Sequence, residues 1–370
     1  MTKKVMIAVG GTGGHIYPSL ALAKQLFKAE PGINVMFVGG DLKNNRFFDR
    51  HQYLHESVEC GPMSSKNPLK IFKNIKRILK GIWQSRSVIK RFKPDVIVGF
   101  GSYYTFPTLL AAKLLKIPII LHEANSIPGK VNRLLSPYAV ATGIHFPDTA
   151  KWLSGRSIEV GMPLREGYVF GSVTKKFAKE YYFLKPDKFV LLVFGGSQGA
   201  KTMNELVSSA LCHYFEHEKG GVQVIHFSGD ADSVEPLEEM YARNGITACV
   251  KQFEPRMDIA WQAADAVISR AGAGTIAEQL EFEVPGILIP YPHSSEDHQK
   301  RNADFMVKTV GGAISFNEEE LTAEKLGKKI GTFLNHDRIL LRTMQDAMSR
   351  YKKNARSKDL CTLVLETKSK

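Results

Sequence analysis

We predict an α/β protein that contains two doubly wound parallel sheets, and three observations lead to this fold class. The chain has 370 residues, a length typical of about two domains. Short apolar runs rich in β-branched residues alternate with amphipathic stretches, which is the pattern of parallel sheets covered by helices. The order of strand, paired glycines and helix that opens the chain returns near residue 188, so the architecture occurs twice.

The buried strands are predicted from these apolar runs. In the first half they are Val5–Gly10, Asn34–Gly40, Asp95–Gly101, Ile117–His122 and Val140–His145. In the second half, after a run that begins at Phe189, they are Val222–Phe227, Thr247–Phe253, Ala266–Ser269, Gly286–Pro290 and Gly312–Phe316. We therefore predict one Rossmann-like domain over residues 1–162 and another over 163–344. A polar helix at about 345–370 is expected to pack back on the first domain.

The composition and charge limit the class of protein. With 44% hydrophobic and 24% charged residues, the chain is typical of a globular protein and not of a disordered one. No run approaches the roughly 18 apolar residues of a membrane span, and Val5–Val9 is too short for a secretory signal, so we expect a cytoplasmic location. The cysteines have no metal-ligand spacing, which predicts reduced thiols. The net charge of +13 predicts attraction to nucleic acid, an anionic membrane or phosphorylated substrates.

The first glycine cluster, Gly10–Gly14, lies between a predicted strand and a helix whose first turn we expect to hold Pro18. The N-terminus of such a helix offers unpaired N–H groups and partial positive charge, and glycines let a diphosphate approach the backbone. We therefore predict an anion site; the alternative is a tight turn that needs positive φ. Ile16 at the third glycine position of G-x-G-x-x-G argues against a dinucleotide, and Asp41 is as typical of a turn as of a ribose site.

Two further glycine turns follow strands in the second half. Gly195–Gly199 contains Ser197 and Gln198 as candidate phosphate donors, and Ser269–Gln279 leads into a helix that carries Glu278. A carboxylate at that place can accept two hydrogen bonds from a ribose diol. Equally, it is a favourable acid in the first turn of a helix, where the helix dipole stabilises it.

A basic amphipathic segment extends from Cys60 to Pro94 without any acidic residue. Its cations are Lys66, Lys70, Lys73, Lys76, Arg77, Lys80, Arg86, Lys90, Arg91 and Lys93, and its apolar residues at helical spacing are Ile71, Ile75, Ile78, Ile82, Ile89 and Phe92, with Leu79 and Trp83. This pattern predicts a helix at an anionic membrane surface. Alternatively, the apolar face packs on the sheet and the cations are solvated, and one helix can do both. No RNA- or DNA-binding motif accompanies the charge, which argues against nucleic acid.

Six segments together resemble one known family. In order along the chain they read GGTGGHIYPSLALA, HEANSIPGKVNRLLSPYA, GMPLR, GGSQGAKTMNE, ISRAGAGTIAE and PYPHSSEDHQKRNA, and they span about residues 5 to 310. Their order and spacing resemble the MurG family. The resemblance implies a GT-B fold and an inverting transfer, without metal or cofactor, of N-acetylglucosamine from UDP-GlcNAc to a lipid-linked muramyl-pentapeptide. That reaction converts lipid I to lipid II in peptidoglycan synthesis, at the cytoplasmic side of the inner membrane, where other cell-wall synthesis enzymes are further candidate partners.

The resemblance also implies roles for individual residues. His15 matches the family's proposed catalytic base. The implied substrate-binding residues are Thr12, Gly13, Gly14, Asn125, Arg165, Ser197, Glu254, Ala273, Gly274, Thr275, Ile276, Ala277, Glu278 and Gln299. Glu254 is expected to meet uracil through its backbone, and Glu278 to meet the ribose. Ser102 and Phe106 replace small residues of the family's second glycine loop, Ala124 replaces a common glutamine, and His298 stands where glutamine is frequent.

The chemistry of these residues leaves alternatives open. His15 beside the positive end of a helix should stay neutral and accept the proton of an attacking hydroxyl; alternatively, its N–H holds the loop to a carbonyl. The Asp230–Asp232 motif, typical of metal-dependent transferases, is interpreted here as a polar turn.

For membrane contact we predict Ile75, Leu79, Ile82 and Trp83 with Lys76, Arg77 and Lys80. Competing hypotheses are another GT-B glycolipid glycosyltransferase with a UDP-sugar donor, a nucleotide-binding oxidoreductase, and a non-enzymatic basic surface protein.

Overall fold

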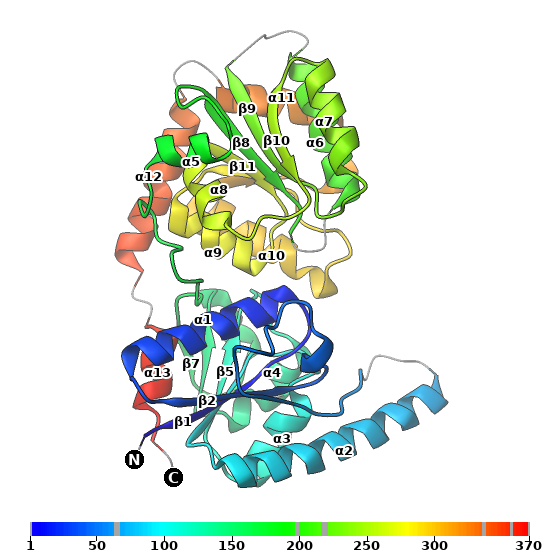
Figure 1. The fold of residues 1–370 in the computed structure, drawn as a ribbon, viewed down its shortest axis with the longest axis vertical. Helices are drawn as coiled ribbons and strands as arrows, with labels where there is room; N and C mark the ends of the chain where they lie inside the picture. The colour runs from blue at the N-terminus through cyan, green and yellow to red at the C-terminus, as the bar shows by residue number, and fades with distance from the viewer. Residues whose placement is uncertain are drawn as a thin grey trace. The chain divides into compact units, whose positions relative to one another are not determined.

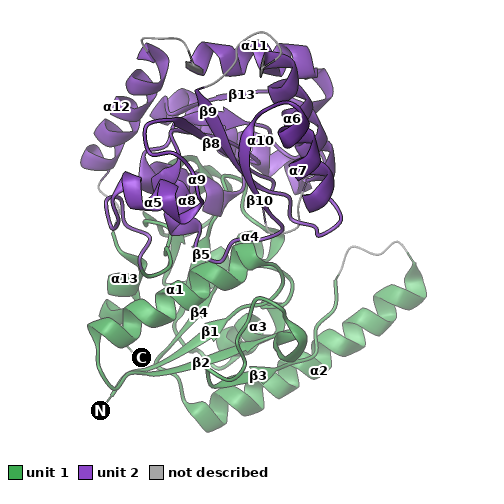
Figure 2. Ribbon diagram, turned by 45° about the horizontal axis from the view of Figure 1, so that its top comes forward, with its two compact units in different colours: residues 1–166, 356–370 green, residues 167–355 purple. Residues whose placement is uncertain are grey.

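The computed structural model describes residues 2–62, 67–196, 200–215, 221–334, 338–355 and 358–368. Two compact units divide the chain, as Figure 2 shows: unit 1 is Met1–Glu166 with Arg356–Lys370, and unit 2 is Gly167–Ala355. Four residues to which the sequence analysis gave a place, Lys66, Ser197, Gln198 and Gly199, lie outside the described residues.

Unit 1 contains one parallel sheet of seven strands (Figure 1). In sheet order these are β3 (His55–Ser57), β2 (Asn34–Gly39), β1 (Lys4–Ala8), β4 (Val96–Gly99), β5 (Ile119–Glu123), β6 (Ala141–Ile144) and β7 (Ser157–Glu159). The apolar runs predicted the five inner strands. They did not predict β3 and β7, because these three-residue edge strands are partly exposed and have no continuous apolar stretch.

The helices of unit 1 cover both faces of its sheet. They are α1 (Gly13–Ala29), α2 (Pro68–Phe92), α3 (Phe106–Leu114), α4 (Lys130–Leu135) and α13 (Leu360–Glu366), with the short helices η1 (Leu42–Asn44), η2 (Ser136–Tyr138) and η3 (Pro147–Trp152). Val5 and Ile7 share a core cluster with Leu22 of α1 and Val364 of α13. Met6 and Ala8 belong to a cluster with residues of α2 and α3 on the other face. This alternation follows from the two-residue period of a strand, so β1 must be apolar on both faces.

Unit 2 repeats this architecture with six parallel strands. In sheet order these are β10 (Thr247–Lys251), β9 (Val222–Phe227), β8 (Phe189–Phe194), β11 (Ala266–Ser269), β12 (Gly286–Leu288) and β13 (Ala313–Ser315). The helices are α5 (Lys175–Tyr181), α6 (Lys201–Phe215), α7 (Val234–Arg243), α8 (Met257–Ala263), α9 (Ala273–Phe282), α10 (His298–Asp304), α11 (Ala323–Leu334) and α12 (Ile339–Asn354), with η4 (Ser295–Asp297), η5 (Phe305–Val310) and η6 (Glu318–Glu320). The predicted fold class, two doubly wound α/β sheets, is confirmed.

The C-terminal segment consists of two helices and not of one. Helix α12 belongs to unit 2, and α13 belongs to unit 1. The Nζ of Lys3, near the N-terminus of the chain, donates hydrogen bonds to the carbonyl oxygens of Leu365 (2.5 Å) in the last turn of α13 and of Thr367 (2.7 Å) just after it. These bonds satisfy carbonyl groups that a helix end leaves without an intrahelical partner.

The strand order places the glycine turns where ligands bind in such folds. In each sheet the order reverses between two neighbouring central strands, β1 and β4 in unit 1 and β8 and β11 in unit 2. Open α/β sheets bind ligands outside the carboxyl ends of the strands at this switch point. The turn before α1 follows β1, and the turn before α9 follows β11, so both lie at a switch point.

Candidate functional site

The first glycine turn is shaped in part by its own packing. Gly11 has φ of 95°, and a Cβ on Gly10 would lie 2.6 Å from the Cβ of Tyr104. A Cβ on Gly13 would lie 2.9 Å from the ring of Tyr17. Gly14 differs, because it is exposed and the nearest atom to its Cβ would be Thr12 Oγ1 at 3.8 Å. Packing therefore explains Gly10 and Gly13, and the positive φ explains Gly11, whereas Gly14 leaves the start of α1 open to a ligand.

Helix α1 begins at Gly13 with Thr12 as its N-cap residue, so Pro18 lies inside the helix. The prediction of Pro18 in the first turn is wrong, because the glycine turn itself already adopts helical geometry. His15, by contrast, lies in the first turn. The positive end of the helix dipole acts on its ring there.

A histidine cluster accompanies His15 at this edge of the sheet. His122 on β5 is buried, and its ring centroid lies 5.1 Å from that of Phe100. Burial, together with the nearby His145 and His15, lowers the pKa of His122 to about 3, and burial lowers the pKa of His145 to about 4. Both rings are therefore neutral at pH 7. The sequence analysis did not connect them with His15, although two predicted strands each end in one of these histidines.

Glu123 holds the segment that carries Asn125. Its Oε1 accepts a hydrogen bond from the Asn125 N–H at 3.0 Å, and its Oε2 accepts from the Gly129 N–H at 3.0 Å and from Asn132 Nδ2 at 2.9 Å. Burial raises the pKa of Glu123, and these hydrogen bonds lower it in part. The backbone at Asn125 is thus fixed by a buried carboxyl group on β5.

Arg165 lies beside α1 within unit 1. Its guanidinium carbon is 5.0 Å from the centroid of the Tyr17 ring, a cation–π geometry. Tyr17 follows His15 by two residues in the helix. The fold thus brings Arg165, distant in sequence, to the helix that begins at the first glycine turn.

In unit 2, residues Ala273–Glu278 form the first turns of α9, with Gly272 as the N-cap residue. Ile276 and Ala277 are buried, so their side chains pack in the core. Gly274 has no atom within 4 Å of the place where a Cβ would lie, so packing does not explain its lack of a side chain. A ligand can therefore approach the backbone at this helix end, where N–H groups and the helix dipole favour an anion.

Helix α9 begins at Ala273, so Glu278 lies in its second turn, and the first turn contains no acidic residue. The alternative interpretation as a first-turn acid is therefore wrong. Its Oε2 accepts a hydrogen bond from Trp261 Nε1 at 2.8 Å.

Glu254 is buried, and its carboxylate pairs with Lys251 Nζ at 2.8 Å and accepts from the Arg256 N–H at 2.9 Å. The Glu254 side chain is thus engaged within its own turn.

A buried ion pair connects three loops of unit 2, and the sequence analysis missed it. Arg270 Nη1 lies 2.7 Å from Glu318 Oε2, and Nη2 lies 3.0 Å from Oε1. Nη1 also donates to the carbonyl oxygens of Ile289 (3.2 Å) and Pro290 (3.3 Å). The residues that follow β11, β12 and β13 are therefore tied together next to the start of α9.

Gln299 belongs to the same group of loops. It lies on α10, and its Oε1 accepts a hydrogen bond from the Tyr291 N–H at 3.0 Å. Asn302 of that helix donates to the Ala271 carbonyl at 3.1 Å.

Two aspartates that the sequence analysis considered for ligands form turns. Asp41 has φ of 58° and accepts a hydrogen bond from Asn44, and Asp230 accepts from both the N–H and the hydroxyl of Ser233. The interpretation of Asp230–Asp232 as a polar turn is confirmed.

Helix α2 has two apolar faces. Ile78, Gly81, Ser85, Val88 and Ile89 are buried, and Ile82 is partly buried against the same core. Leu69 (80% exposed), Phe72, Ile75, Leu79 and Trp83 (71% exposed) form a second, solvent-facing stripe. The cations also divide: Arg77 and Lys80 pair with Glu59, whereas the ammonium of Lys76 lies 4.5 Å from the centroid of the Phe72 ring. Within the ranges that the structure describes, no helix is both long and apolar enough to span a membrane.

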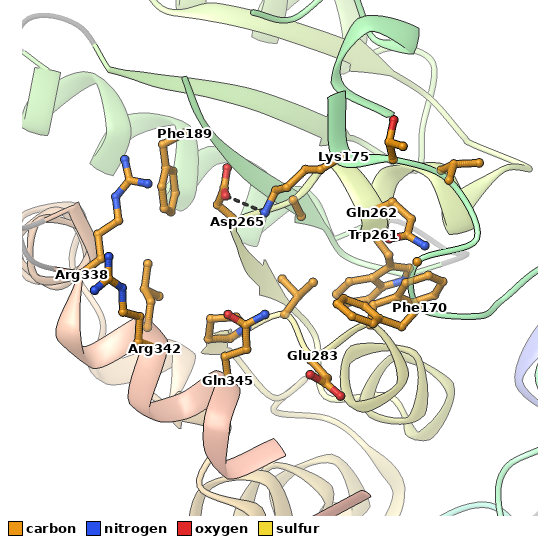
Figure 3. A pocket seen from close by; sticks show the side chains of 18 residues that line it. Phe170, Lys175, Phe189, Trp261, Gln262, Asp265, Glu283, Arg338, Arg342 and Gln345 are labelled. Carbon is orange, nitrogen blue, oxygen red and sulfur yellow. Dashed lines mark ion pairs between the residues drawn. The ribbon is translucent and has the colours of Figure 1, made fainter. Parts of the chain in front are cut away.

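A cavity of about 530 Å³ in unit 2 lies away from the switch point (Figure 3). Phe170, Phe189, Trp261 and Arg342 are among the residues that line it. Phe189 is the first residue of β8, and Asp265, whose carboxylate pairs with Lys175 at 2.6 Å, precedes β11. The cavity is therefore at the amino-terminal edge of the sheet, opposite the glycine turns.

Comparisons with known proteins show the family of this chain. Residues 5–144 match the glycosyltransferase family 28 N-terminal domain, and residues 190–360 match the C-terminal domain of that family. A protein of Protochlamydia amoebophila, named UDP-N-acetylglucosamine–N-acetylmuramyl-(pentapeptide) pyrophosphoryl-undecaprenol N-acetylglucosamine transferase, is 48% identical over 99% of this chain and 96% of its own length. A Chlamydia felis protein of the same name is 36% identical over 98% of both chains.

Solved structures show the same fold. The crystal structure of Acinetobacter baumannii MurG has a TM-score of 0.75 and 28% identity, covering 98% of both chains. A UDP-glucose:anthocyanidin 3-O-glucosyltransferase, solved in complex with UDP, has a TM-score of 0.64 at 15% identity over 95% of this chain and 94% of its own, a likeness of fold alone. The fold is GT-B, and the chain belongs to glycosyltransferase family 28 and, within it, to the MurG transferases.

Proposed function

We propose that this protein transfers N-acetylglucosamine from UDP-GlcNAc to the muramyl hydroxyl of undecaprenyl-pyrophosphoryl-MurNAc-pentapeptide, which converts lipid I to lipid II in peptidoglycan synthesis. The observation that carries the proposal is the 48% identity to a transferase of that name over 99% of this chain. The glycine turns at the switch points of both sheets support it, since a diphosphate-linked donor and a diphosphate-linked acceptor each need an anion site.

The donor is proposed to bind at unit 2. The N–H groups at the start of α9, from Ala273 to Thr275, would bind the diphosphate, and Ser197 of the preceding glycine turn would assist. Glu278 would accept hydrogen bonds from the ribose, and the backbone at Glu254 would meet uracil. Gln299, fixed through Tyr291, would bind hydroxyl groups of the sugar.

The acceptor is proposed to bind at unit 1, where Thr12, Gly13 and Gly14 would receive its diphosphate and Asn125 would bind its sugar. The muramyl hydroxyl attacks the anomeric carbon on the face opposite UDP. The new C–O bond forms as the bond to the UDP oxygen breaks, and the hydroxyl proton passes to His15. Such a positioned base contributes about 10²–10⁴-fold. The negative charge that develops on UDP would be stabilised by backbone N–H groups and by Arg165.

The solvent-facing stripe of α2 is proposed to hold the enzyme on the cytoplasmic leaflet of the cell membrane as a peripheral protein. Leu79 and Trp83 would enter the interface between head groups and acyl chains. Each neighbouring cation contributes on the order of 1 kcal/mol toward an anionic surface. Enzyme and lipid-linked acceptor would then meet in two dimensions.

The test is a transfer assay with purified protein, UDP-GlcNAc and lipid I in vesicles. We expect release of UDP and formation of the lipid-linked disaccharide, and the absence of both would contradict the proposal. Diacylglycerol and sterol acceptors in parallel reactions examine the alternative of another glycolipid transferase.

For the base, His15→Ala should lower kcat by about 10²–10⁴-fold while UDP binding stays nearly unchanged. Near-normal turnover of this variant would exclude the role.

A further inference from the structure

Trp261 is a buried side chain that reaches the carboxylate of Glu278. It lies on α8 and is 1% exposed. Its ring stacks parallel to that of Phe282, with centroids 6.3 Å apart, and meets the ring of Phe194 edge-on at 5.6 Å. Figure 3 shows Trp261 with Phe170 at one end of the cavity at the amino-terminal edge of the sheet. Because aromatic rings enclose the indole, its N–H has a fixed position.

The indole N–H donates a hydrogen bond of 2.8 Å to Glu278 Oε2. Glu278 is only partly buried, and a glutamate side chain that solvent reaches ordinarily samples several rotamers. A bond from a rigid buried donor to an ionised oxygen removes much of that freedom. The carboxylate is therefore oriented before any ligand arrives, and a ligand does not bear the entropic cost of ordering it.

We propose that Trp261 is a positioning residue that orients Glu278 for the ribose diol of the donor, and that it sets how strongly the site distinguishes a ribose from a sugar without those hydroxyls. A carboxylate has about four lone-pair sites, so a group that accepts from the indole can also accept from the 2′- and 3′-hydroxyls of a ribose. The inference rests on the proposed function, which assigns Glu278 to the ribose.

The test compares two ligands and one substitution. Trp261→Phe keeps an aromatic ring in the core but removes the N–H donor, and calorimetry measures the Kd of UDP and of 2′,3′-dideoxy-UDP. For the wild-type protein we expect UDP to bind at least tenfold more tightly. For Trp261→Phe we expect UDP to bind about tenfold more weakly, a change of about 1.4 kcal/mol, while dideoxy-UDP changes less than twofold. In turnover, KM for UDP-GlcNAc should rise while kcat stays within about twofold.

The controls separate positioning from a general packing effect. Trp152→Phe makes the same chemical change on η3 of unit 1 and should alter neither Kd. Glu278→Gln should weaken UDP binding and leave dideoxy-UDP binding nearly unchanged. If Trp261→Phe does not fold, 3-benzothienylalanine at this position keeps the bicyclic shape and replaces the N–H by sulfur, and the same comparison applies.

The results distinguish failure of the inference from failure of the proposed function. Equal weakening of both ligands by Trp261→Phe, or unchanged UDP affinity, would overturn the positioning role while wild-type discrimination still supports Glu278 at the ribose. A wild-type protein that binds UDP without discriminating against dideoxy-UDP would overturn both the role of Glu278 and the inference built on it.

Discussion

Replacing Glu318 by alanine should destabilise unit 2 by about 3 kcal/mol. The side chains of Arg270 and Glu318 are only 7% and 10% exposed, and two N–H···O bonds of 2.7 and 3.0 Å join them. Removing one partner of such a pair costs about 3–5 kcal/mol, because the other charge stays buried. Two backbone carbonyl oxygens, at 3.2 and 3.3 Å from Nη1, would still accept from the guanidinium, so we expect the lower end of this range.

Urea unfolding followed by tryptophan fluorescence measures this change in the unit that contains it. The three tryptophans divide between the units: Trp83 and Trp152 lie in unit 1, and the buried Trp261 lies in unit 2. In a background with Trp83→Phe and Trp152→Phe, the fluorescence change reports the unfolding of unit 2. The free energy of unfolding is then compared with and without Glu318→Ala.

Two control variants make the result specific. Replacing both partners by apolar residues, as in Arg270→Met with Glu318→Leu, should cost clearly less than the single substitution, because no charge remains buried. Glu239→Ala removes an exposed partner of Arg243 and should have no measurable effect. A loss below about 1 kcal/mol for Glu318→Ala, or a double variant as unstable as the single one, would refute the reasoning that a buried unpaired guanidinium is the cause.

Three other predictions use different properties of the structure. Gly274→Ala should leave the Tm unchanged or slightly higher, because the added methyl group meets no atom within 4 Å and alanine favours a helix. The same substitution should raise KM for UDP-GlcNAc, because the methyl group would stand where the donor approaches the backbone. Unchanged kinetics would show that the donor does not bind at this helix end. Burial lowers the pKa of His226 to about 3, below the roughly 6.5 of an unfolded chain, so the unfolded state binds the proton first and stability is lost as the pH falls from about 6.5 toward 3. Urea titrations should show a loss from this residue that approaches about 1.4 kcal/mol per pH unit below about pH 6, roughly 2 kcal/mol in total between pH 7 and 5, and the same dependence in His226→Gln would contradict the assignment. Lys73→Glu with Lys76→Glu should weaken binding to phosphatidylglycerol vesicles in a salt-dependent way without affecting the Glu59 pairs; unchanged sedimentation with vesicles would assign α2 to packing alone.

Much of the fold could be predicted from the sequence, for a physical reason. Strands in a sheet covered on both faces must be apolar at every position, so runs such as Phe189–Phe194 are visible without any alignment. The short edge strand at His55–Ser57 is partly exposed and therefore has no such run. The start of a helix has no such pattern, because glycines that make a turn also allow a helix to begin among them. That is why α1 begins at Gly13 and Pro18 lies inside it.

The candidate site divides in the same way. Glycine turns and the residues beside them, such as His15 and Glu278, are local features of the chain, so sequence alone predicted them. The partners of these residues are distant in sequence. Arg270 and Glu318 are 48 residues apart, and Trp261 reaches Glu278 from another helix. No local pattern encodes such a contact, because it exists only when the carboxyl ends of the strands have been brought to one edge.

The sequence by itself therefore determined the class of fold, the family and the helix ends at which anions are expected to bind, because buried strands and glycine turns follow from local covalent and steric properties. The tertiary structure alone decided which groups hold those ends in place. It showed that Trp261 donates a hydrogen bond to Glu278, that Glu123 fixes the backbone at Asn125, and that Arg77 and Lys80 of α2 pair with Glu59 whereas Lys76 lies over Phe72 of the solvent-facing stripe. The physical reason is that the pairing of polar groups depends on distances across the sheet, which packing sets and the order of residues does not.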